Sequence, residues 1–308
     1  MHNSKTSLNN VSDLLLSQGY ISDASVAMSV FLSMQLRKPL LIEGPAGVGK
    51  TEIAKVMARA LDTDLIRLQC YEGLDATHAL YEWNYQHQLL YLKMAESRQL
   101  SDINALQSNL DIENTIFSDK FLLKRPLMQA ITHPKSPVLL IDEIDRADEE
   151  FESFLLEILS DWQITIPEIG TVKAKNIPYV IVTGNRTREL SEALRRRCLY
   201  LYIGYPDFEK ELAIVRSKVP QLDARLGEQM CAFMSVLRQQ KLDKIPGIAE
   251  TLDWAQALLA LHIDYLDKKI VEETLGVILK DWQDVRQTQF SLTELFEKTG
   301  AISKFDNL

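Results

Sequence analysis

Short apolar runs alternate with longer amphipathic stretches over the first two thirds of the chain. Two of the amphipathic stretches, residues 53–61 and 151–159, repeat apolar side chains at helical spacing. Alternation of this kind predicts a parallel α/β sheet with helices packed against it. The runs that we expect to form its strands are residues 39–42, 65–68, 138–141, 179–183 and 199–203.

This regular alternation is interrupted within the first domain and ends beyond it. The pattern loosens after the second strand, which predicts an insertion at roughly 71–120 with a polar stretch at 97–114. Residues 164–174 alternate apolar and polar around Pro-Glu-Ile-Gly, as a β-hairpin does. Beyond residue 204 only helical periodicity remains. We therefore predict an α/β nucleotide-binding domain over 1–204 and an all-helical lid domain over 205–308.

Composition limits the classes of partner and compartment. The 308 residues are 46% hydrophobic and 25% charged, which is ordinary for globular domains, and the net charge is −9. This charge gives no general attraction to phosphate backbones, so we expect no nucleic-acid partner. No apolar run reaches the length of a bilayer span, and the polar first ten residues lack a signal-peptide core. We expect a soluble, cytoplasmic protein without a membrane span.

Metal clusters and disulfides are not expected. Cys70, Cys198 and Cys231 lie far apart with no CxxC spacing, and the five histidines are equally dispersed. Small core residues in a reducing compartment explain these cysteines best.

The strongest chemical signal is a glycine loop that matches G-x-x-x-x-G-K-[ST] between a predicted strand and a predicted helix. Its glycines let successive backbone N–H groups and a helix N-terminus face nucleotide phosphates. Lys50 would reach the β- and γ-phosphates of ATP, and the Thr51 hydroxyl would bind Mg²⁺. The alternative is a chance glycine turn that caps a helix. The expected nucleotide-binding residues are Gly44, Pro45, Ala46, Gly47, Val48, Gly49, Lys50, Thr51 and Glu52.

Two acids and an amide follow later strands, at the sheet edge where the glycine loop also emerges. Asp142 would hold Mg²⁺, and Glu143 would polarise the attacking water. A solvated strand end is the alternative for these acids. Asn185 would orient the water or the γ-phosphate, and the alternative there is a turn residue in Gly184-Asn185.

Two further features have competing interpretations. An arginine of the cluster at 195–197 could stabilise phosphoryl transfer in a neighbouring subunit. The alternative is a solvated basic face, or pairing with local acids such as Glu189 and Glu192. The aromatic, acid-rich segments 71–74 and 80–83 would grip a protein if exposed and pack in the core if buried.

The order of these motifs resembles that of the AAA+ ATPases, and within them the MoxR-like group. The resemblance spans the predicted nucleotide-binding domain. Residues 66–74 and 79–83 look more specifically like the CoxD-type branch, ATPases associated with maturation of molybdenum-containing carbon monoxide dehydrogenase. The stretches that carry the wider resemblance are residues 44–51, Leu-Ile-Asp-Glu-Ile-Asp-Arg-Ala at 140–147, Thr-Gly-Asn at 183–185, and residues 195–197 with Gly-Tyr-Pro at 204–206.

The resemblance implies a P-loop sheet of order 5-1-4-3-2, a helical lid, and a ring homo-oligomer, usually a hexamer, with ATP between subunits. It implies a hairpin insertion after the second strand, matched by part of 71–91, and a hairpin before the first sensor, Asn185. Arg196 best matches the arginine finger, with Arg197 next. The implied partners are a protein with a von Willebrand factor A domain and a metalloenzyme client.

One departure from the family pattern concerns the lid. MoxR-like lids usually carry a sensor arginine at the start of a helix, but residues 247–254 read Gly-Ile-Ala-Glu-Thr-Leu-Asp-Trp. We therefore assign no second sensor. The leading hypothesis is an ATP-driven chaperone that remodels a client; the alternatives are a small-molecule kinase, a nucleotide-gated scaffold and a DNA-associated motor.

Overall fold

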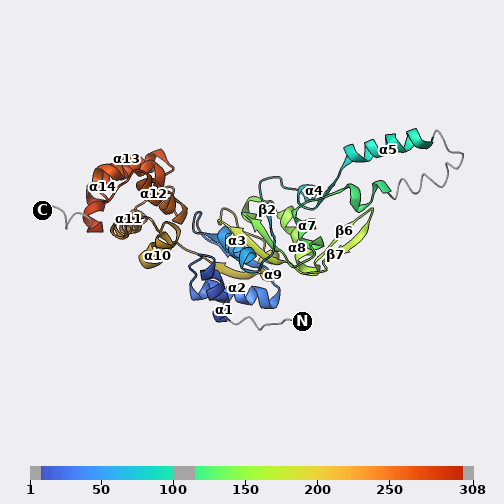
Figure 1. Cartoon of the computed structure of the whole chain (residues 1–308), viewed down its shortest axis with the longest axis horizontal. Helices are drawn as coiled ribbons and strands as arrows, with labels where there is room; N and C mark the ends of the chain where they lie inside the picture. The colour runs from blue at the N-terminus through green and yellow to red at the C-terminus, as the bar shows by residue number, and fades with distance from the viewer. Residues whose placement is uncertain (1–7, 100–114, 301–308) are drawn as a thin grey trace. The chain divides into compact units, whose positions relative to one another are not determined.

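The computed structural model describes residues 8–99 and 115–300 (Figure 1). Most of the polar stretch predicted at 97–114 therefore lies outside the described residues. Contacts divide the chain into two compact units. Of the described residues, one unit comprises 28–42, 57–99 and 115–201, and the other comprises 8–27, 43–56 and 202–300. The predicted division at residue 204 stays a prediction.

A five-stranded sheet follows the apolar runs of the sequence. Its strand order is β2-β5-β8-β1-β9, which, counting only these strands along the chain, is the order 5-1-4-3-2 read from the other edge. The fold class and the strand order are thus confirmed. The strands are β1 (Leu40–Glu43), β2 (Leu65–Gln69), β5 (Val138–Asp142), β8 (Tyr179–Gly184) and β9 (Leu199–Tyr202).

Parallel pairing sets the register that places the later chemistry. β2 pairs with β5 so that Gln69 lies opposite Asp142, and β5 pairs with β8 so that Ile141 lies opposite Val182. All five residues of β5 are buried, as expected for a central strand covered on both faces. The carboxyl ends of β2, β5 and β8 therefore lie together at one edge of the sheet.

Helices precede and follow these strands in the α/β part of the chain (Figure 1). α8 buries Phe151, Leu155 and Ile158 at helical spacing, which was the apolar face read from the sequence. The helices are α1 (Leu8–Ser17), α2 (Ala24–Leu36), α3 (Lys50–Ala60), α4 (Ala76–Ala79), α5 (Tyr85–Gln99), α7 (Pro126–Thr132), α8 (Glu149–Asp161) and α9 (Glu192–Arg197). Short 3₁₀ turns span Asp119–Phe121 and Ile144–Arg146.

The insertion after β2 differs from the local hairpin expected within 71–91. That stretch contributes one strand, β3 (Tyr81–Trp83), which pairs antiparallel with β4 (Leu122–Lys124) from beyond the polar stretch. Trp83 is buried, and its ring packs edge-on against Phe117 at 5.4 Å between centroids. Core packing is therefore the correct interpretation for Trp83, whereas Tyr71 is exposed.

A second two-stranded ribbon lies where the alternating pattern was read. β6 (Gln163–Ile166) pairs antiparallel with β7 (Gly170–Lys173). The residues of β6 alternate between buried and more exposed positions, so Ile164 and Ile166 join the core while Thr165 faces outward.

The helical region after β9 has a core of its own. Trp254, Phe233 and Phe296 meet there, with ring centroids 5.7 Å apart for each contact of Phe233. Its helices are α10 (Phe208–Lys218), α11 (Ala224–Leu237), α12 (Ile248–Ala260), α13 (Lys268–Ile278) and α14 (Trp282–Thr299).

Candidate active site

Asp142 ends the buried strand β5, and the residue is only 3% exposed. Two side chains from the neighbouring strands hold it. The Thr183 hydroxyl donates to Oδ1 at 2.5 Å, and Arg67 Nη2 donates to Oδ2 at 2.5 Å. The arginine compensates the buried negative charge, which would otherwise be costly.

Glu143 leaves the strand in the left-handed region, with φ 57° and ψ 50°. Its backbone N–H donates to the Thr183 hydroxyl at 3.0 Å, so one hydroxyl joins both acids. Its carboxylate accepts from Gln69 Nε2 at 3.0 Å and from Asn185 Nδ2 at 3.5 Å, and pairs with Arg146 Nε at 2.9 Å. The structure thus brings the two predicted acids and the predicted amide into one cluster.

Asp145 holds the loop that carries Asn185. Its Oδ2 accepts from the N–H of Asn185 at 3.1 Å, and from the N–H and hydroxyl of Thr187 at 2.8 and 2.6 Å. Burial by itself raises the pKa of this carboxyl, but these hydrogen bonds outweigh burial and lower the pKa below its usual range. Asp145 therefore stays ionised and fixes the backbone beside Glu143.

A buried thiol next to this cluster takes no part in the chemistry. Burial raises the pKa of Cys70 to about 12, and the negative charges of Asp142, Asp145 and Glu143 add to the effect. The thiol stays protonated at neutral pH and is a poor nucleophile.

Several members of the cluster were given no role from the sequence, among them Arg67, Gln69 and Thr183. Arg67 and Gln69 lie on β2 and alternate with buried Ile66 and Leu68. Two polar side chains at the carboxyl end of a strand next to β5 were the signal that could have revealed them.

The predicted arginines lie on α9, apart from the contacts just described. Arg196 Nη2 pairs with Glu192 Oε1 at 2.5 Å, which is the local pairing considered as the alternative. Arg197 Nε donates to Ser160 Oγ at 2.7 Å. Both arginines are exposed.

A buried ion pair places α9. Glu152 on α8 is fully buried; its Oε1 pairs with Arg188 at 2.5 Å and its Oε2 accepts from the N–H of Ser191 at 2.8 Å. Ser191 is the N-cap of α9 and accepts from the N–H of Leu194. The position of the arginine helix therefore depends on Glu152.

The phosphate loop connects β1 to α3, with Lys50, Thr51 and Glu52 in the first turn of that helix. A Cβ added at Gly44 would lie 2.0 Å from the carbonyl oxygen of Ile203, so only glycine fits there. Lys50 is nearly buried, and its Nζ donates to the carbonyls of Gly44 and Pro45 at 2.8 and 2.6 Å. Glu52 pairs with Lys55 at 3.6 Å.

The chemical groups of the phosphate loop and of Asp142 are of the kinds that bind a nucleotide with a divalent cation. Gly47 and Gly49 have φ of 74° and 92°, which lets the loop curl its N–H groups around phosphates. Lys50 is held by neutral carbonyls of the loop, partners that phosphate oxygens can replace. The carboxylate of Asp142 and the hydroxyl of Thr51 are oxygen ligands of the kind that Mg²⁺ prefers.

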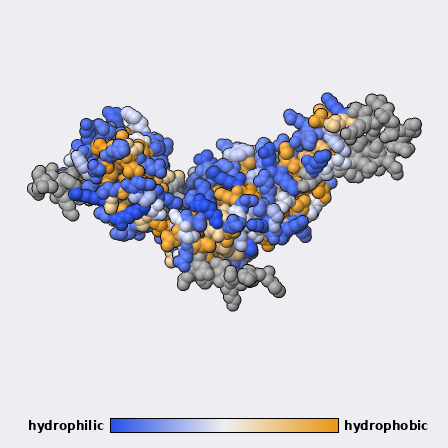
Figure 2. Space-filling view, in the orientation of Figure 1, coloured by the Kyte–Doolittle hydropathy of each residue, from blue (hydrophilic) through white to orange (hydrophobic). Residues whose placement is uncertain are grey.

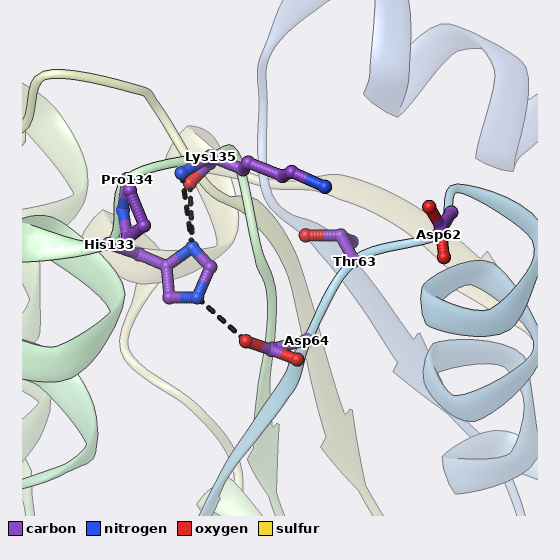
Figure 3. Close-up of a pocket in the computed structure, with 6 residues that line it drawn as sticks. All are labelled: Asp62, Thr63, Asp64, His133, Pro134 and Lys135. Atoms are coloured by element: carbon purple, nitrogen blue, oxygen red, sulfur yellow. Dashed lines mark hydrogen bonds and ion pairs between the residues drawn. The ribbon is translucent and has the colours of Figure 1, made fainter.

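The cavity drawn in Figure 3 is at the other end of the strands. It measures about 350 Å³, and the side chains of Asp64 and His133 meet in it at 2.9 Å. Asp64 immediately precedes β2 and Lys135 lies shortly before β5, so this cavity is at the amino edge of the sheet. The acids lie at the opposite edge, and the cavity is therefore no part of their site.

Comparisons with known proteins bear on the family of this chain. Residues 39–198 match the model of the AAA domain, dynein-related subfamily. An uncharacterized Staphylococcus aureus protein is 26% identical over 277 residues, which cover 87% of this chain and 93% of that protein. The gas vesicle ATPase GvpN of Haloferax mediterranei is 24% identical over 249 residues, covering 78% and 67%.

Solved structures are similar over most of the length. The Thermotoga maritima RuvB Holliday junction branch migration motor aligns over 94% of this chain and 76% of its own, with 17% identity and a TM-score of 0.45.

Within residues 8–99 and 115–300, no helix combines the length and the apolar character needed to cross a membrane.

Proposed function

This chain belongs to the AAA domain family, in its dynein-related subfamily, and from that premise we propose that it is a Mg²⁺-dependent ATPase that remodels a client protein. Membership of the AAA+ ATPases supports ATP hydrolysis. The observation that carries the catalytic assignment is the cluster in which one hydroxyl, that of Thr183, joins Asp142 and Glu143 beside Asn185.

Each residue has a separate task in this proposal. Backbone N–H groups of the phosphate loop and the Lys50 ammonium bind the phosphates, and Thr51 and Asp142 hold Mg²⁺, which neutralises phosphate charge. Glu143 accepts a proton from the attacking water, and Asn185 orients that water. Gln69 and Arg146 keep the Glu143 carboxylate in place.

A ring homo-oligomer, in the form of a hexamer, completes the site. Arg196 and Arg197 are exposed and lie outside the acid cluster of their own chain. An arginine that acts on a neighbouring subunit needs this exposure, because its target is not in its own chain. We assign the finger to Arg196, with Arg197 as the second candidate.

The proposed client is a metalloenzyme of the carbon monoxide dehydrogenase type, recognised together with a von Willebrand factor A-domain partner in the cytoplasm. Exposed apolar side chains on α5, Leu89, Leu90 and Met94, support a protein client. Figure 2 shows orange side chains at the position of this helix. The GvpN relative is a gas vesicle ATPase. A protein assembly is therefore the second class of client that we propose.

Substitution of the proposed base tests this function. Glu143→Gln keeps the hydrogen-bonding shape but cannot accept the proton, so ATP turnover should fall by about 10² to 10⁴-fold while ATP binding remains. Phosphate release measures turnover, and calorimetric titration measures binding. Hydrolysis at the wild-type rate in this variant would contradict the role of Glu143.

Two controls separate the alternatives. Turnover that requires a small acceptor molecule would indicate a kinase, and tight binding without turnover in assembled wild-type protein would indicate a nucleotide-gated scaffold. Glu297→Gln, a matched change on the exposed surface of α14, should leave turnover unchanged.

A further inference from the structure

One lid helix begins without a side-chain cap. The first N–H groups of a helix have no partner within the helix, so a capping side chain usually accepts from them. Helix α12 instead starts after Gly247, which has no side chain that could accept from these groups. Each of the other lid helices starts with an aspartate that accepts from its first turn: Asp207, Asp223, Asp267 and Asp281.

The phosphate loop supplies the missing acceptor. The carbonyl oxygen of Gly47 accepts from the N–H of Ile248 at 2.9 Å and from the N–H of Ala249 at 3.2 Å. Both donors belong to the first turn of α12. The loop predicted to bind nucleotide therefore also accepts hydrogen bonds from the first turn of a lid helix.

The two backbones meet so closely that the contact requires glycine. A Cβ added at Gly247 would lie 2.8 Å from the carbonyl oxygen of Ala46 and 2.9 Å from the Cα of Gly47. Both of these atoms belong to backbone, which cannot swing aside as a flexible side chain can. Movement of either segment toward the other is therefore opposed by direct backbone contact.

A buried arginine holds the lid side of this contact. Arg238 forms a two-pronged ion pair with Glu211, at 2.6 and 2.7 Å, and donates to Thr251 at 2.9 Å. It also donates to the carbonyls of Pro246, at 2.8 Å, and Gly247, at 3.3 Å. Its side chain is 8% exposed, and that of Glu211 is fully buried. Arg238 thus positions the turn that leads into α12.

We propose that the junction of Gly47 with the first turn of α12 couples nucleotide binding in the phosphate loop to the lid, with Arg238 as its positioning residue. This inference rests on the proposed function. The resemblance led us to expect a lid arginine for this task, and residues 247–254 contain none. A backbone contact does the coupling instead.

The orientation of the Gly47 carbonyl explains why the contact should strengthen nucleotide binding. A peptide unit is planar and trans, so a carbonyl that points at α12 turns the N–H of Val48 to the opposite side. The lid thereby holds one loop peptide in a fixed orientation before phosphates arrive, and such preorganisation increases affinity. By linkage, bound nucleotide must in turn stabilise the first turn of α12.

A proline at the first helical position tests the junction. Ile248→Pro removes one donor to Gly47 but suits the start of a helix, and Gly247 already has the extended backbone, φ −92° and ψ −167°, that a following proline requires. Ile248→Ala loses the same side chain but keeps the N–H. The full-length variants are titrated with Mg²⁺ and ADP, which needs no hydrolysis, and hydrogen exchange of residues 249–252 is followed with and without ADP.

We expect Ile248→Pro to bind ADP about 2- to 10-fold more weakly than Ile248→Ala, the range of one net hydrogen bond. The slowing of exchange that ADP causes in Ile248→Ala should be lost in Ile248→Pro. The matched control is Lys268→Pro, a proline at the first position of α13 after Asp267, which also has an extended backbone. It should bind ADP as the wild type does.

A second variant reports on the close contact without removing a hydrogen bond. Gly247→Ala should weaken ADP binding in the same direction, whereas Gly276→Ala, in open space on α13, should not. Equal affinity and equal exchange in Ile248→Pro and Ile248→Ala would overturn the coupling. Absence of nucleotide binding and hydrolysis in the wild type would overturn the proposed function, and the coupling with it.

Discussion

Hydroxyl groups organise the acids at the scale of single residues. Thr183 donates to Asp142 and accepts from the backbone of Glu143, and Thr187 donates to buried Asp145. Each hydroxyl can donate and accept at once, so a single threonine can fix two partners. Replacement of a threonine by valine keeps the shape and removes this function, which makes the hydroxyls testable.

Thr187→Val should lower the free energy of unfolding by about 1 to 3 kcal/mol at neutral pH, because the ionised Asp145 loses a hydroxyl donor. The hydrogen bonds lower the pKa of Asp145 in the folded state, so their stabilisation is present above the unfolded pKa of about 3.9. It is lost as the pH falls through the lower folded pKa. Urea unfolding from pH 7 to pH 3 measures this difference, which should shrink in acid.

The control for this prediction is Thr165→Val on β6, where the exposed hydroxyl lies 3.3 Å from the hydroxyl of Thr171, a neutral partner. Its effect should be small and independent of pH. A difference between wild type and Thr187→Val that stays constant down to pH 3 would contradict the role of the Asp145 charge.

At the scale of elements, buried ion pairs fix the positions of helices α9 and α12. The exposed arginines of α9 depend on this positioning. Glu152 joins α8 to the start of α9 through Arg188 and the N–H of Ser191. Arg238 joins α11 to the start of α12 in the lid. In both places a buried carboxylate needs its arginine, because an unpaired buried charge is very costly. These pairs set helix position more than they add stability.

Arg188→Met should destabilise the protein by about 3 to 5 kcal/mol, since it leaves Glu152 buried without its cation. Adding Glu152→Leu to that variant should recover much of the loss, because both charges are then absent. Denaturant unfolding measures both changes. A loss below about 1 kcal/mol in the single variant would contradict the importance of the pair.

At the scale of the whole molecule, the proposed ring makes one chain complete the site of another. Arg196 and Arg197 on α9 are exposed, and in their own chain they bond to Glu192 and Ser160. Assembly would therefore control turnover. A subunit without the finger arginine and a subunit without the base Glu143 can then form a complete site between them when the two are mixed.

Arg196→Ala or Arg197→Ala should lower ATP turnover by roughly 10³-fold if that side chain is the finger. Mixing the variant with Glu143→Gln protein should restore part of the activity, because the Glu143→Gln subunit still supplies an arginine to its neighbour. Phosphate release at several mixing ratios measures the recovery, and sedimentation confirms that mixed assemblies form. Arg216→Ala, at an exposed ion pair on α10, is the control and should keep full activity.

Failure of both α9 variants to recover activity in mixed assemblies would contradict action across an interface. A fall in turnover for Arg216→Ala equal to that of the finger variants would indicate that any lost surface arginine has the same effect.

Local patterns determined much of this protein without any structure. Buried positions recur every two residues in a strand and every three to four residues in a helix. Apolar spacing alone therefore predicted the five strands and the face of α8. The phosphate loop and the acids at 142 and 143 are contiguous in the chain, so their chemistry could also be read locally. The strand order came from the family resemblance, and the structure confirmed it.

Contacts between distant segments were decided only by the tertiary structure. Arg67 meets Asp142 because β2 pairs with β5 in one register, and β3 finds its partner at β4, beyond the polar stretch of the insertion. The carbonyl of Gly47 caps α12 from about two hundred residues away. A hydrophobic pattern states that a segment is buried but not against what, since partner and register depend on how the segments pack together.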